Sequence, residues 1–389
     1  MFFSVFIEIV LLSLFFPYLF IDFIVPILVI VANFINKPIE QFIKNKYIKK
    51  ATNKINKISC LKIAITGSYG KTSVKNYISD VLRKKYIVMF SPKSYNTPLG
   101  ISKFINTTNF LYTDFMISEF GARRSGDIKE LASYFDYDIS IVTSIGEMHI
   151  DTFKTVDTIV KEKMSIIKKY DKSHIAILNY ENDLIRNYIV DCIKYTYGFN
   201  CGKYQAKNIV LSIFDSKFDL FVDNIFVRSF VVKVLGRSAI LNLLPAIILC
   251  HLYDVDFKYI DDVLMVDNRL SLRIMNNYYI LDDAYNSNIL GATYALEVLR
   301  SFEGDKYLIT PGFVEMDLIK EELAIKYADE ISKSVDQLIL VKNDFTKLLS
   351  KYLDNVSICF VDSFKEGFNL FLKVKTNNSI VLIENDLLE

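Results

Sequence analysis

The feature that most constrains the fold is a short apolar strand that runs through a glycine-containing turn into a helix. Residues 60–66, "CLKIAIT", are typical of a buried parallel strand, and residues 71–86 carry apolar side chains at helical spacing. The turn between them departs from the standard phosphate loop, because Ile65 stands where a glycine is needed five positions before Gly70. Strand, turn and helix in this order still make an anion site, since backbone N–H groups of the loop and of the helix N-terminus converge there.

The stretch "TGSYGKTS" (66–73) is therefore interpreted as a shortened ATP loop, with an accidental turn as the alternative that the motif alone leaves open. Lys71 is expected to reach the β- and γ-phosphates, and Thr72 to offer its hydroxyl to Mg²⁺. The other expected nucleotide contacts in the loop are Gly67, Ser68, Gly70 and Ser73.

The rest of the chain alternates strand-like and helical segments in the rhythm of an α/β protein. Strand-like runs at 115–120, 139–145 and 174–180, with a helix around 155–169, predict a parallel sheet. Residues 207–234 alternate as antiparallel strands, and a second α/β unit begins near residue 268. We expect a central P-loop-type α/β ATPase domain over residues 61–267 and a C-terminal Rossmann-like α/β domain over residues 268–389.

The N-terminal 35 residues are almost uncharged, with only Glu8 and Asp22, and exceed the roughly 20 residues that cross a bilayer as a helix. They predict a transmembrane anchor over residues 1–35, either one span or a hairpin broken at Pro17 and Pro26. A buried helix of a soluble domain is the alternative. Residues 36–60 read as a basic linker, whose lysines predict that the catalytic domains lie on the cytoplasmic face of the cell membrane.

Composition excludes several other classes of protein. The net charge is +1, so no basic field favours nucleic acid as a partner. The five cysteines are scattered, without the spacing of a zinc site or a disulfide framework, and this pattern indicates a reducing compartment.

Three further residues fall where the carboxyl ends of parallel strands meet the loop. Glu119 ends one strand-like run, His149 follows the next, and Lys163 lies fourteen residues later on a helix. Taken singly, they read as a surface acid, a loop histidine and a solvated lysine. Together with the loop they predict a magnesium nucleotide site.

This combination resembles the Mur ligase family of ATP-dependent amide-forming enzymes, from about residue 61 to the end of the chain. The similarity is closest to the type that joins D-alanyl-D-alanine to a UDP-muramoyl-tripeptide in peptidoglycan synthesis. The stretches that carry it occur in the family's order: "TGSYGKTSVK" (66–75), "SYNTPLGI" (94–101), "SEFGARRSGDI" (118–128), "SIGEMHIDTF" (144–153), "VKEKMSI" (160–166), "GRSAILN" (236–242), "DNRLSLR" (267–273) and "DDAYNSN" (282–288).

The resemblance assigns roles to residues of this chain. It implies two Mg²⁺ ions held by Thr72, Glu119, His149 and a carbamylated Lys163. Carbamylation has a physical reason, since a free ammonium would repel Mg²⁺ whereas a carbamate supplies hard oxygen ligands. The further implied contacts are Asn242 at the adenine, Arg269 and Asp283 on ATP after domain closure, and Asn96, Arg123 and Asn286 on the substrate.

The chain also departs from the family pattern. The segment before residue 61 leaves no room for the family's N-terminal domain that holds the UDP end, which leaves open a partner subunit in its place. Ser238 and Ala239 replace a His and an Asn near the adenine, and Asn268 stands where a His is common.

The expected reaction activates a carboxylate as an acyl phosphate, which an amine then attacks to form an amide. The substrates are expected to be a soluble or lipid-linked muramoyl-peptide and an amino acid or dipeptide. Two alternatives remain at this point: a ligase for another envelope polymer or peptide, and a membrane-tethered ATP-binding regulatory protein.

Overall fold

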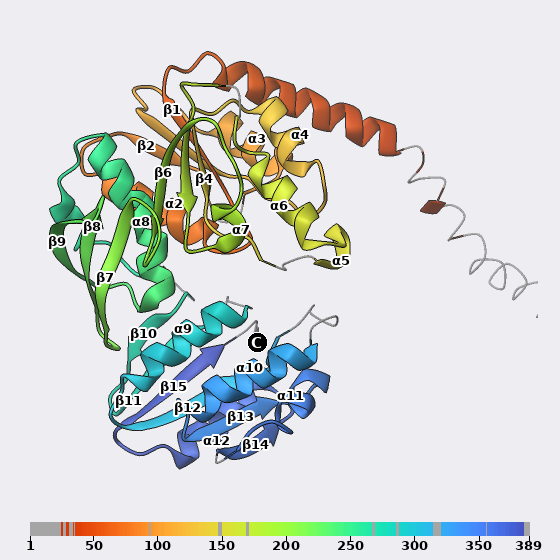
Figure 1. Cartoon of the computed structure of the whole chain (residues 1–389). Coiled ribbons are helices and arrows are strands. Elements are labelled where there is room, and N and C mark those ends of the chain that lie inside the picture. Colours follow the sequence, from red (N-terminus) through yellow and green to blue (C-terminus); the bar gives the residue numbers. More distant parts are fainter. Residues whose placement is uncertain are drawn as a thin grey trace, which may run out of the picture.

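The computed structural model describes residues 25, 29–30, 34, 36–92, 95–146, 150–168, 171–266, 269–284, 288–313, 320–354 and 356–384. Two β-sheets, each covered by helices, form two bodies that lie one above the other (Figure 1). The larger sheet belongs to the central part of the chain and the smaller one to the C-terminal part.

The larger sheet has nine strands in the order β2-β3-β1-β4-β5-β6-β7-β8-β9. Neighbours from β2 to β7 pair in parallel, and β7, β8 and β9 pair antiparallel at one edge. The strands are β1 (Leu61–Thr66), β2 (Val88–Phe90), β3 (Phe115–Glu119), β4 (Ile139–Val142), β5 (Ile175–Asn179), β6 (Ile193–Gly198), β7 (Tyr204–Leu211), β8 (Ser216–Val222) and β9 (Ile225–Val232).

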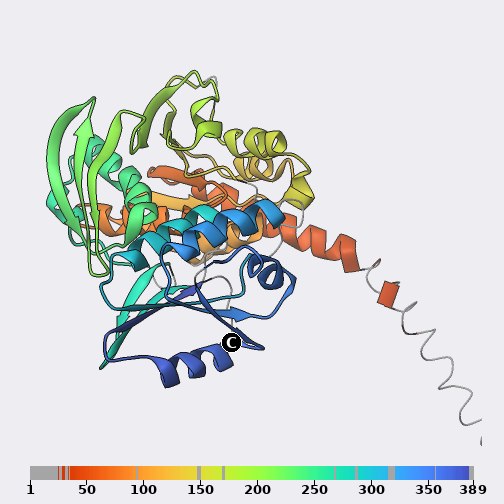
Figure 2. The same ribbon diagram turned by 60° about the horizontal axis from the view of Figure 1, so that its bottom comes forward.

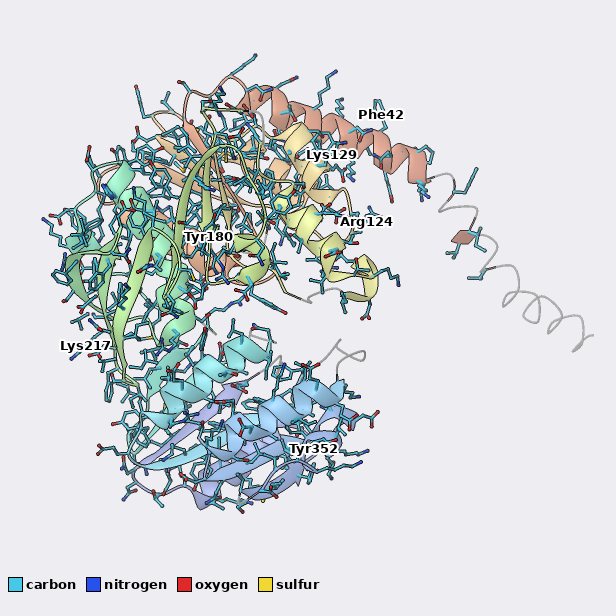
Figure 3. All side chains as sticks on the ribbon, viewed as in Figure 1. Phe42, Arg124, Lys129, Tyr180, Lys217 and Tyr352 are labelled. Carbon is cyan, nitrogen blue, oxygen red and sulfur yellow. The ribbon has the colours of Figure 1, made fainter. Side chains whose placement is uncertain are left out.

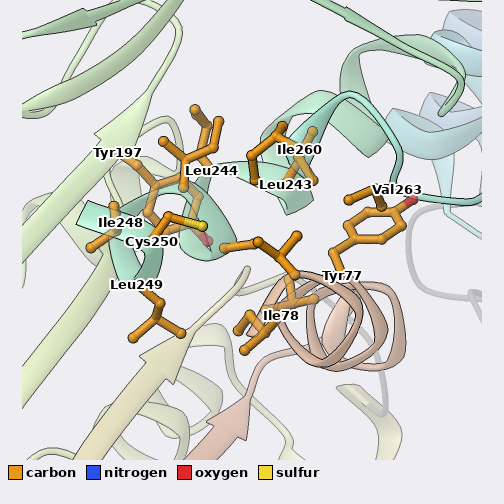
Figure 4. Close-up of a cluster of buried hydrophobic side chains, with 14 of the residues drawn as sticks. Tyr77, Ile78, Tyr197, Leu243, Leu244, Ile248, Leu249, Cys250, Ile260 and Val263 are labelled. Carbon is orange, nitrogen blue, oxygen red and sulfur yellow. The ribbon is translucent and has the colours of Figure 1, made fainter. Parts of the chain in front are cut away.

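Helices cover both faces of this sheet because its central strands are apolar on both sides. The first face holds α2 (Lys71–Leu82) and α8 (Gly236–Leu252), which pack on each other as in Figure 4 through residues such as Tyr77, Ile78 and Leu243. The opposite face is covered by helix 36–55 and by α3 (Pro98–Thr107), α4 (Asp127–Tyr134) and α6 (Val156–Met164). Three short helices complete this part: α5 (Ile150–Phe153), α7 (Asp183–Arg186) and η1 (Phe257–Ile260).

The smaller sheet has six strands in the order β10-β11-β15-β12-β13-β14, all parallel except β10. They are β10 (Ser271–Ile274), β11 (Tyr278–Asp283), β12 (Asp305–Thr310), β13 (Gln337–Val341), β14 (Ser357–Val361) and β15 (Ser379–Glu384). Side chains that alternate along the strands of this sheet pack into two separate hydrophobic cores. One core holds α9 (Ile289–Arg300), α10 (Lys320–Ser332) and α11 (Asp344–Leu349), and the other holds α12 (Phe364–Val374).

Figure 2 shows α12 on the outer face of this body, with α9 and α10 on the face toward the central part. The result is a three-layer α/β/α body, as the alternating pattern predicted.

The transmembrane anchor in the predicted fold class is wrong. No helix in the described part of the chain combines the length and the apolar character that a bilayer crossing needs. Of residues 1–35, only residues 25, 29, 30 and 34 are among those described, so the rest of that stretch lies outside the described residues. The fold is mixed α/β with two sheets, and the membrane partner and the kinked span or hairpin are withdrawn with the anchor.

The stretch expected to be a basic linker forms a helix over residues 36–55. Its C-terminal half docks on the central part through Ile48, Ala51 and Ile55, whose three- and four-residue spacing places them on one face. Residues 36–43 are exposed on all sides, and Figure 3 shows Phe42 on the projecting end of this helix.

Candidate functional site

The loop between β1 and α2 has the geometry of an anion-binding turn. β1 ends at Thr66 and α2 begins at Lys71, and Gly70 occupies the N-cap position with φ 83°, a left-handed conformation that glycine adopts without strain. No side chain caps the helix, so the N–H groups of its first turn have no side-chain acceptor. The positive end of the α2 dipole and these N–H groups suit a phosphate.

The loop is held against the carboxyl end of β4 by residues that the sequence analysis did not single out. The Ser68 N–H donates to the Ser144 carbonyl oxygen at 2.8 Å, and the Tyr69 N–H donates to Ser144 Oγ at 2.9 Å. The Thr143 hydroxyl donates to the Tyr69 carbonyl oxygen, and a Cβ on Gly67 would lie 2.1 Å from Thr143 Oγ1. Only glycine therefore fits at position 67 with the loop in this place.

Glu119, the last residue of β3, lies beside Thr72 in the first turn of α2. The Thr72 hydroxyl donates to Glu119 Oε2 at 3.3 Å, and the Lys75 ammonium lies 2.7 Å from Glu119 Oε1. The Lys75 and Glu119 side chains are each 1% exposed. Lys75, one turn after Lys71 on α2, is thus part of the site; its four-residue spacing from Lys71 was the signal for it.

Lys71 folds back over the loop. Its ammonium donates to the Gly67 carbonyl oxygen at 2.6 Å and to the Ser68 carbonyl oxygen at 3.2 Å. Burial lowers the pKa of Lys71 to about 8; the charge of Glu119 opposes this, and the like charge of Arg269 adds to it. The charge of Lys71 therefore interacts both with Glu119 beside the loop and with Arg269 of the C-terminal part.

Lys163 is buried on α6, with 3% of its surface exposed, and its ammonium lies 3.4 Å from the Ala122 carbonyl oxygen. Burial lowers its pKa to about 7, and the charge of Lys71 lowers it further. The neighbouring Glu162 accepts from the N–H groups of Gly126 and Ile128, both at 2.7 Å, so the helix that carries Lys163 is tied to the start of α4. A solvated surface lysine is excluded by this burial.

A cavity between the two bodies brings the loop together with residues from distant parts of the chain. Gly70 and Ser73 line it from the loop and α2, Asn242 from α8, and Arg269 and Asp283 from the C-terminal part. Asn242 touches the loop directly, since a Cβ on Gly70 would lie 2.5 Å from Asn242 Oδ1. The remaining lining residues that the sequence analysis did not single out include Tyr69, Asn179, Glu181, Asn182 and Tyr294.

The other expected site residues are placed as follows. The Asn96 carbonyl oxygen accepts from the Gly121 N–H at 2.9 Å, which sets it beside the end of β3. Arg123 is exposed, and its backbone N–H donates to Asp127 Oδ2 at 2.9 Å. His149 and Asn286 lie outside the described residues, and in the described part of the chain no three His, Cys, Asp or Glu side chains gather as a metal cluster.

The residues present fit magnesium and a triphosphate. The Thr72 hydroxyl and the Glu119 carboxylate are hard oxygen ligands of the kind that Mg²⁺ prefers, and they lie next to each other at the loop. The uncapped start of α2 and the Lys71 ammonium supply the donors and the positive charge for phosphate oxygens.

Gly70→Ala is expected to weaken ATP binding by about ten-fold or more, because the methyl group adds a collision with Asn242 to the strain of a left-handed alanine. Calorimetric titration with ATP and Mg²⁺ measures this. Gly126→Ala is the matched control, because Gly126 is also a left-handed N-cap, with φ 96°, but has nothing within 4 Å of its Cβ position. Equal ATP affinities of the two variants would contradict the prediction.

Comparison with known proteins matches the central part of the chain to the family that its sequence motifs resemble. Residues 65–250 match the family described as the Mur ligase middle domain. The UDP-N-acetylmuramoyl-tripeptide–D-alanyl-D-alanine ligase of Rickettsia prowazekii is 27% identical over 342 residues, which cover 83% of this chain and 74% of that protein. The enzyme of the same name from Borreliella burgdorferi is 27% identical over 355 residues, 85% of this chain and 73% of that protein.

Solved structures show the same fold. The MurF ligase of Thermotoga maritima in complex with ADP superimposes with a TM-score of 0.79 at 20% identity, covering 88% of this chain and 80% of that one. MurF from Acinetobacter baumannii gives a TM-score of 0.76 at 17% identity, covering 88% and 77%.

Proposed function

We propose that this chain, whose residues 65–250 match the Mur ligase middle domain, uses ATP to join D-alanyl-D-alanine to a UDP-muramoyl-tripeptide in peptidoglycan synthesis. The observation that carries the proposal is the shared cavity, in which the ATP loop, Asn242 of α8, and Arg269 and Asp283 of the C-terminal body line one space. A nucleotide bound there touches both bodies, so binding and domain closure are coupled.

In this proposal the chain's own residues position the reactants and neutralise charge. The α2 N-terminus and Lys71 hold the β- and γ-phosphates while a substrate carboxylate attacks the γ-phosphorus, giving an acyl phosphate and ADP. The unprotonated amine then attacks the acyl carbon to give a tetrahedral intermediate, which forms the amide as phosphate leaves with the proton that the nitrogen gives up. Positive charge fixed at the loop stabilises the oxyanions that develop in both steps. Magnesium, held by Thr72 and Glu119 with His149 and Lys163 as further ligands, supplies charge neutralisation when bound.

We further propose that Lys163 acts as a carbamate. A buried lysine with its pKa lowered to about 7 is about half unprotonated near neutral pH, and the unprotonated amine is the form that adds CO₂. The amine nitrogen bonds to the carbon of CO₂ and loses a proton to solvent, which gives an anion with two oxygens that Lys71 attracts rather than repels. The burial of Lys163 against the Ala122 carbonyl supports this proposal.

Arg269 and Asp283 are proposed to contact ATP from the C-terminal body. Asp283 is buried, and its Oδ1 accepts from the Leu270 N–H at 3.0 Å, so the two segments that carry the pair are joined. Asn96, Arg123 and Asn286 remain proposed substrate contacts. Free cysteines at all five positions suit a reducing compartment, and we place the reaction in the cytoplasm.

ADP release by the purified full chain tests the function. With ATP, Mg²⁺, UDP-muramoyl-tripeptide and D-alanyl-D-alanine, we expect release that requires both substrates and a product that contains the added dipeptide. ATP binding without turnover on these substrates would contradict the proposed substrates, and the same assay with other acids and amines would then separate a ligase for another envelope polymer from a regulatory ATP-binding protein.

A further inference from the structure

A second buried acid lies close to the site at the carboxyl end of β15. Glu384 is the last residue of that strand, and its backbone pairs in register with Asp283 of β11. On the other side of β15 runs β12, which ends at Thr310. Figure 1 shows the arrowhead of β15 pointing toward the central part of the molecule.

Glu384 is only partly satisfied by its neighbours. Its side chain is 1% exposed, and the Tyr327 hydroxyl of α10 donates to Oε2. Within the described part of the chain, Oε1 is buried and has no hydrogen-bond partner. A buried carboxyl oxygen without a donor is costly, and native structures retain few of them.

The charged group that acts on Glu384 is another carboxylate, that of Asp283. Burial raises the pKa of Glu384 to about 8; the Tyr327 hydrogen bond opposes this, and the like charge of Asp283 adds to it. No ion pair joins Glu384 to a lysine or arginine in the described residues. A pKa of about 8 leaves this carboxyl group mostly protonated at neutral pH, so a cation bound against it would favour the charged form by displacing that proton.

The position of Glu384 limits what that cation is. Neighbouring strands lie about 4.8 Å apart, so Glu384 is one strand from Asp283, and Asp283 lines the cavity shared with Gly70 and Asn242. Ligands of open α/β sheets bind outside the carboxyl ends of the strands. A cation bound by Glu384 would therefore lie on the side of the sheet where the proposed ligation takes place.

We propose that Glu384, held in orientation by the Tyr327 hydroxyl, binds the cationic amino group of the amine substrate. The proposal rests on the proposed function and names a specificity residue for it. It accounts for the missing partner of Oε1, since an ammonium donates hydrogen bonds to carboxylate oxygens. The substrate class it selects is an amine that enters as an ammonium and loses a proton before its nitrogen attacks the acyl phosphate.

Glu384→Gln tests the proposal, because it removes the charge and keeps the shape and the acceptor for Tyr327. We expect the KM for D-alanyl-D-alanine to rise about ten-fold or more, while the KM values for ATP and UDP-muramoyl-tripeptide stay within about two-fold. N-acetyl-D-alanyl-D-alanine, which lacks the ammonium, is tested as a competitive inhibitor. Its inhibition constant is expected to be the same in wild type and variant.

Glu303→Gln is the matched control, since Glu303 is exposed and precedes β12, at the opposite end of the same sheet. Tyr327→Phe keeps the charge of Glu384 but removes its hydrogen bond, and we expect it to raise the dipeptide KM about three-fold. The Glu384 proposal is overturned if the wild-type enzyme ligates and neither Glu384→Gln nor Tyr327→Phe changes the KM for D-alanyl-D-alanine. It is also overturned if Glu384→Gln weakens the dipeptide and its N-acetyl analogue equally. Absence of wild-type turnover counts against the proposed function. Calorimetric titration of wild type and of Glu384→Gln with D-alanyl-D-alanine then tests the role of Glu384, and equal affinities overturn it.

Discussion

Lys163→Ala is expected to lower ligation turnover by about a hundred- to a thousand-fold, the usual loss when one group that stabilises developing charge is removed. The side chain is buried beside the loop, within electrostatic reach of Lys71, so bulk water does not take over its role. If the working form is a carbamate, the alanine variant leaves a space that a small carboxylate fits. Added acetate or formate is therefore expected to restore part of the activity, measured as ADP release with both substrates.

Lys161→Ala is the control for this experiment, because Lys161 is exposed on the same helix, two residues away. Its turnover is expected to stay within about two-fold of wild type, as for a surface substitution away from the site. Loss of activity in Lys163→Ala without rescue by any short acid would reject the carbamate and leave a structural lysine. Full activity of Lys163→Ala would reject any role for this residue in the reaction.

Lys75→Met is expected to destabilise the fold by about 3–5 kcal/mol, because it leaves the Glu119 carboxylate buried without its partner. The two side chains are each 1% exposed, so water does not solvate the charge that remains. Lys75 also donates to the Ser91 carbonyl oxygen at 2.8 Å, and that acceptor loses its donor as well. Urea unfolding followed by far-ultraviolet circular dichroism measures the change in the free energy of unfolding.

The double variant Lys75→Met/Glu119→Gln separates charge from packing. Removing both charges is expected to recover most of the lost stability, because no uncompensated ion is then buried. Lys326→Met is the surface control; its i,i+4 pair with Glu322 is exposed, and we expect a change within about 0.5 kcal/mol. A Lys75→Met variant as stable as wild type would show that Glu119 is not held by this ion pair.

The local elements of the site followed from the sequence because they depend on near neighbours. A strand of apolar residues, a turn with glycine at position 70 and a helix from Lys71 are set by side-chain spacing and by the conformational freedom of glycine. The α/β alternation also predicted both sheets, since parallel strands joined by helices have few other arrangements. The antiparallel edge of the larger sheet was visible in the alternation of residues 207–234.

The prediction of a transmembrane anchor over residues 1–35 rested on the length and apolar composition of that stretch and on the lysines that follow it. An apolar stretch in the sequence does not establish a spanning helix, and the described helix over residues 36–55 carries lysines together with an apolar face that docks on the central part. Contact with the protein body accounts for that apolar face.

What the sequence by itself determined was the chemistry carried by short stretches: a loop with Gly70, Lys71 and Thr72, an acid at position 119 and a lysine at position 163. Only the tertiary structure decided which partners complete them. Lys75 pairs with Glu119 across 44 positions, Asn242 contacts Gly70, and Asp283 shares the cavity with both. These contacts depend on which strands are neighbours in a sheet and on how two bodies meet, and long-range pairing of this kind leaves no periodic signal in the chain.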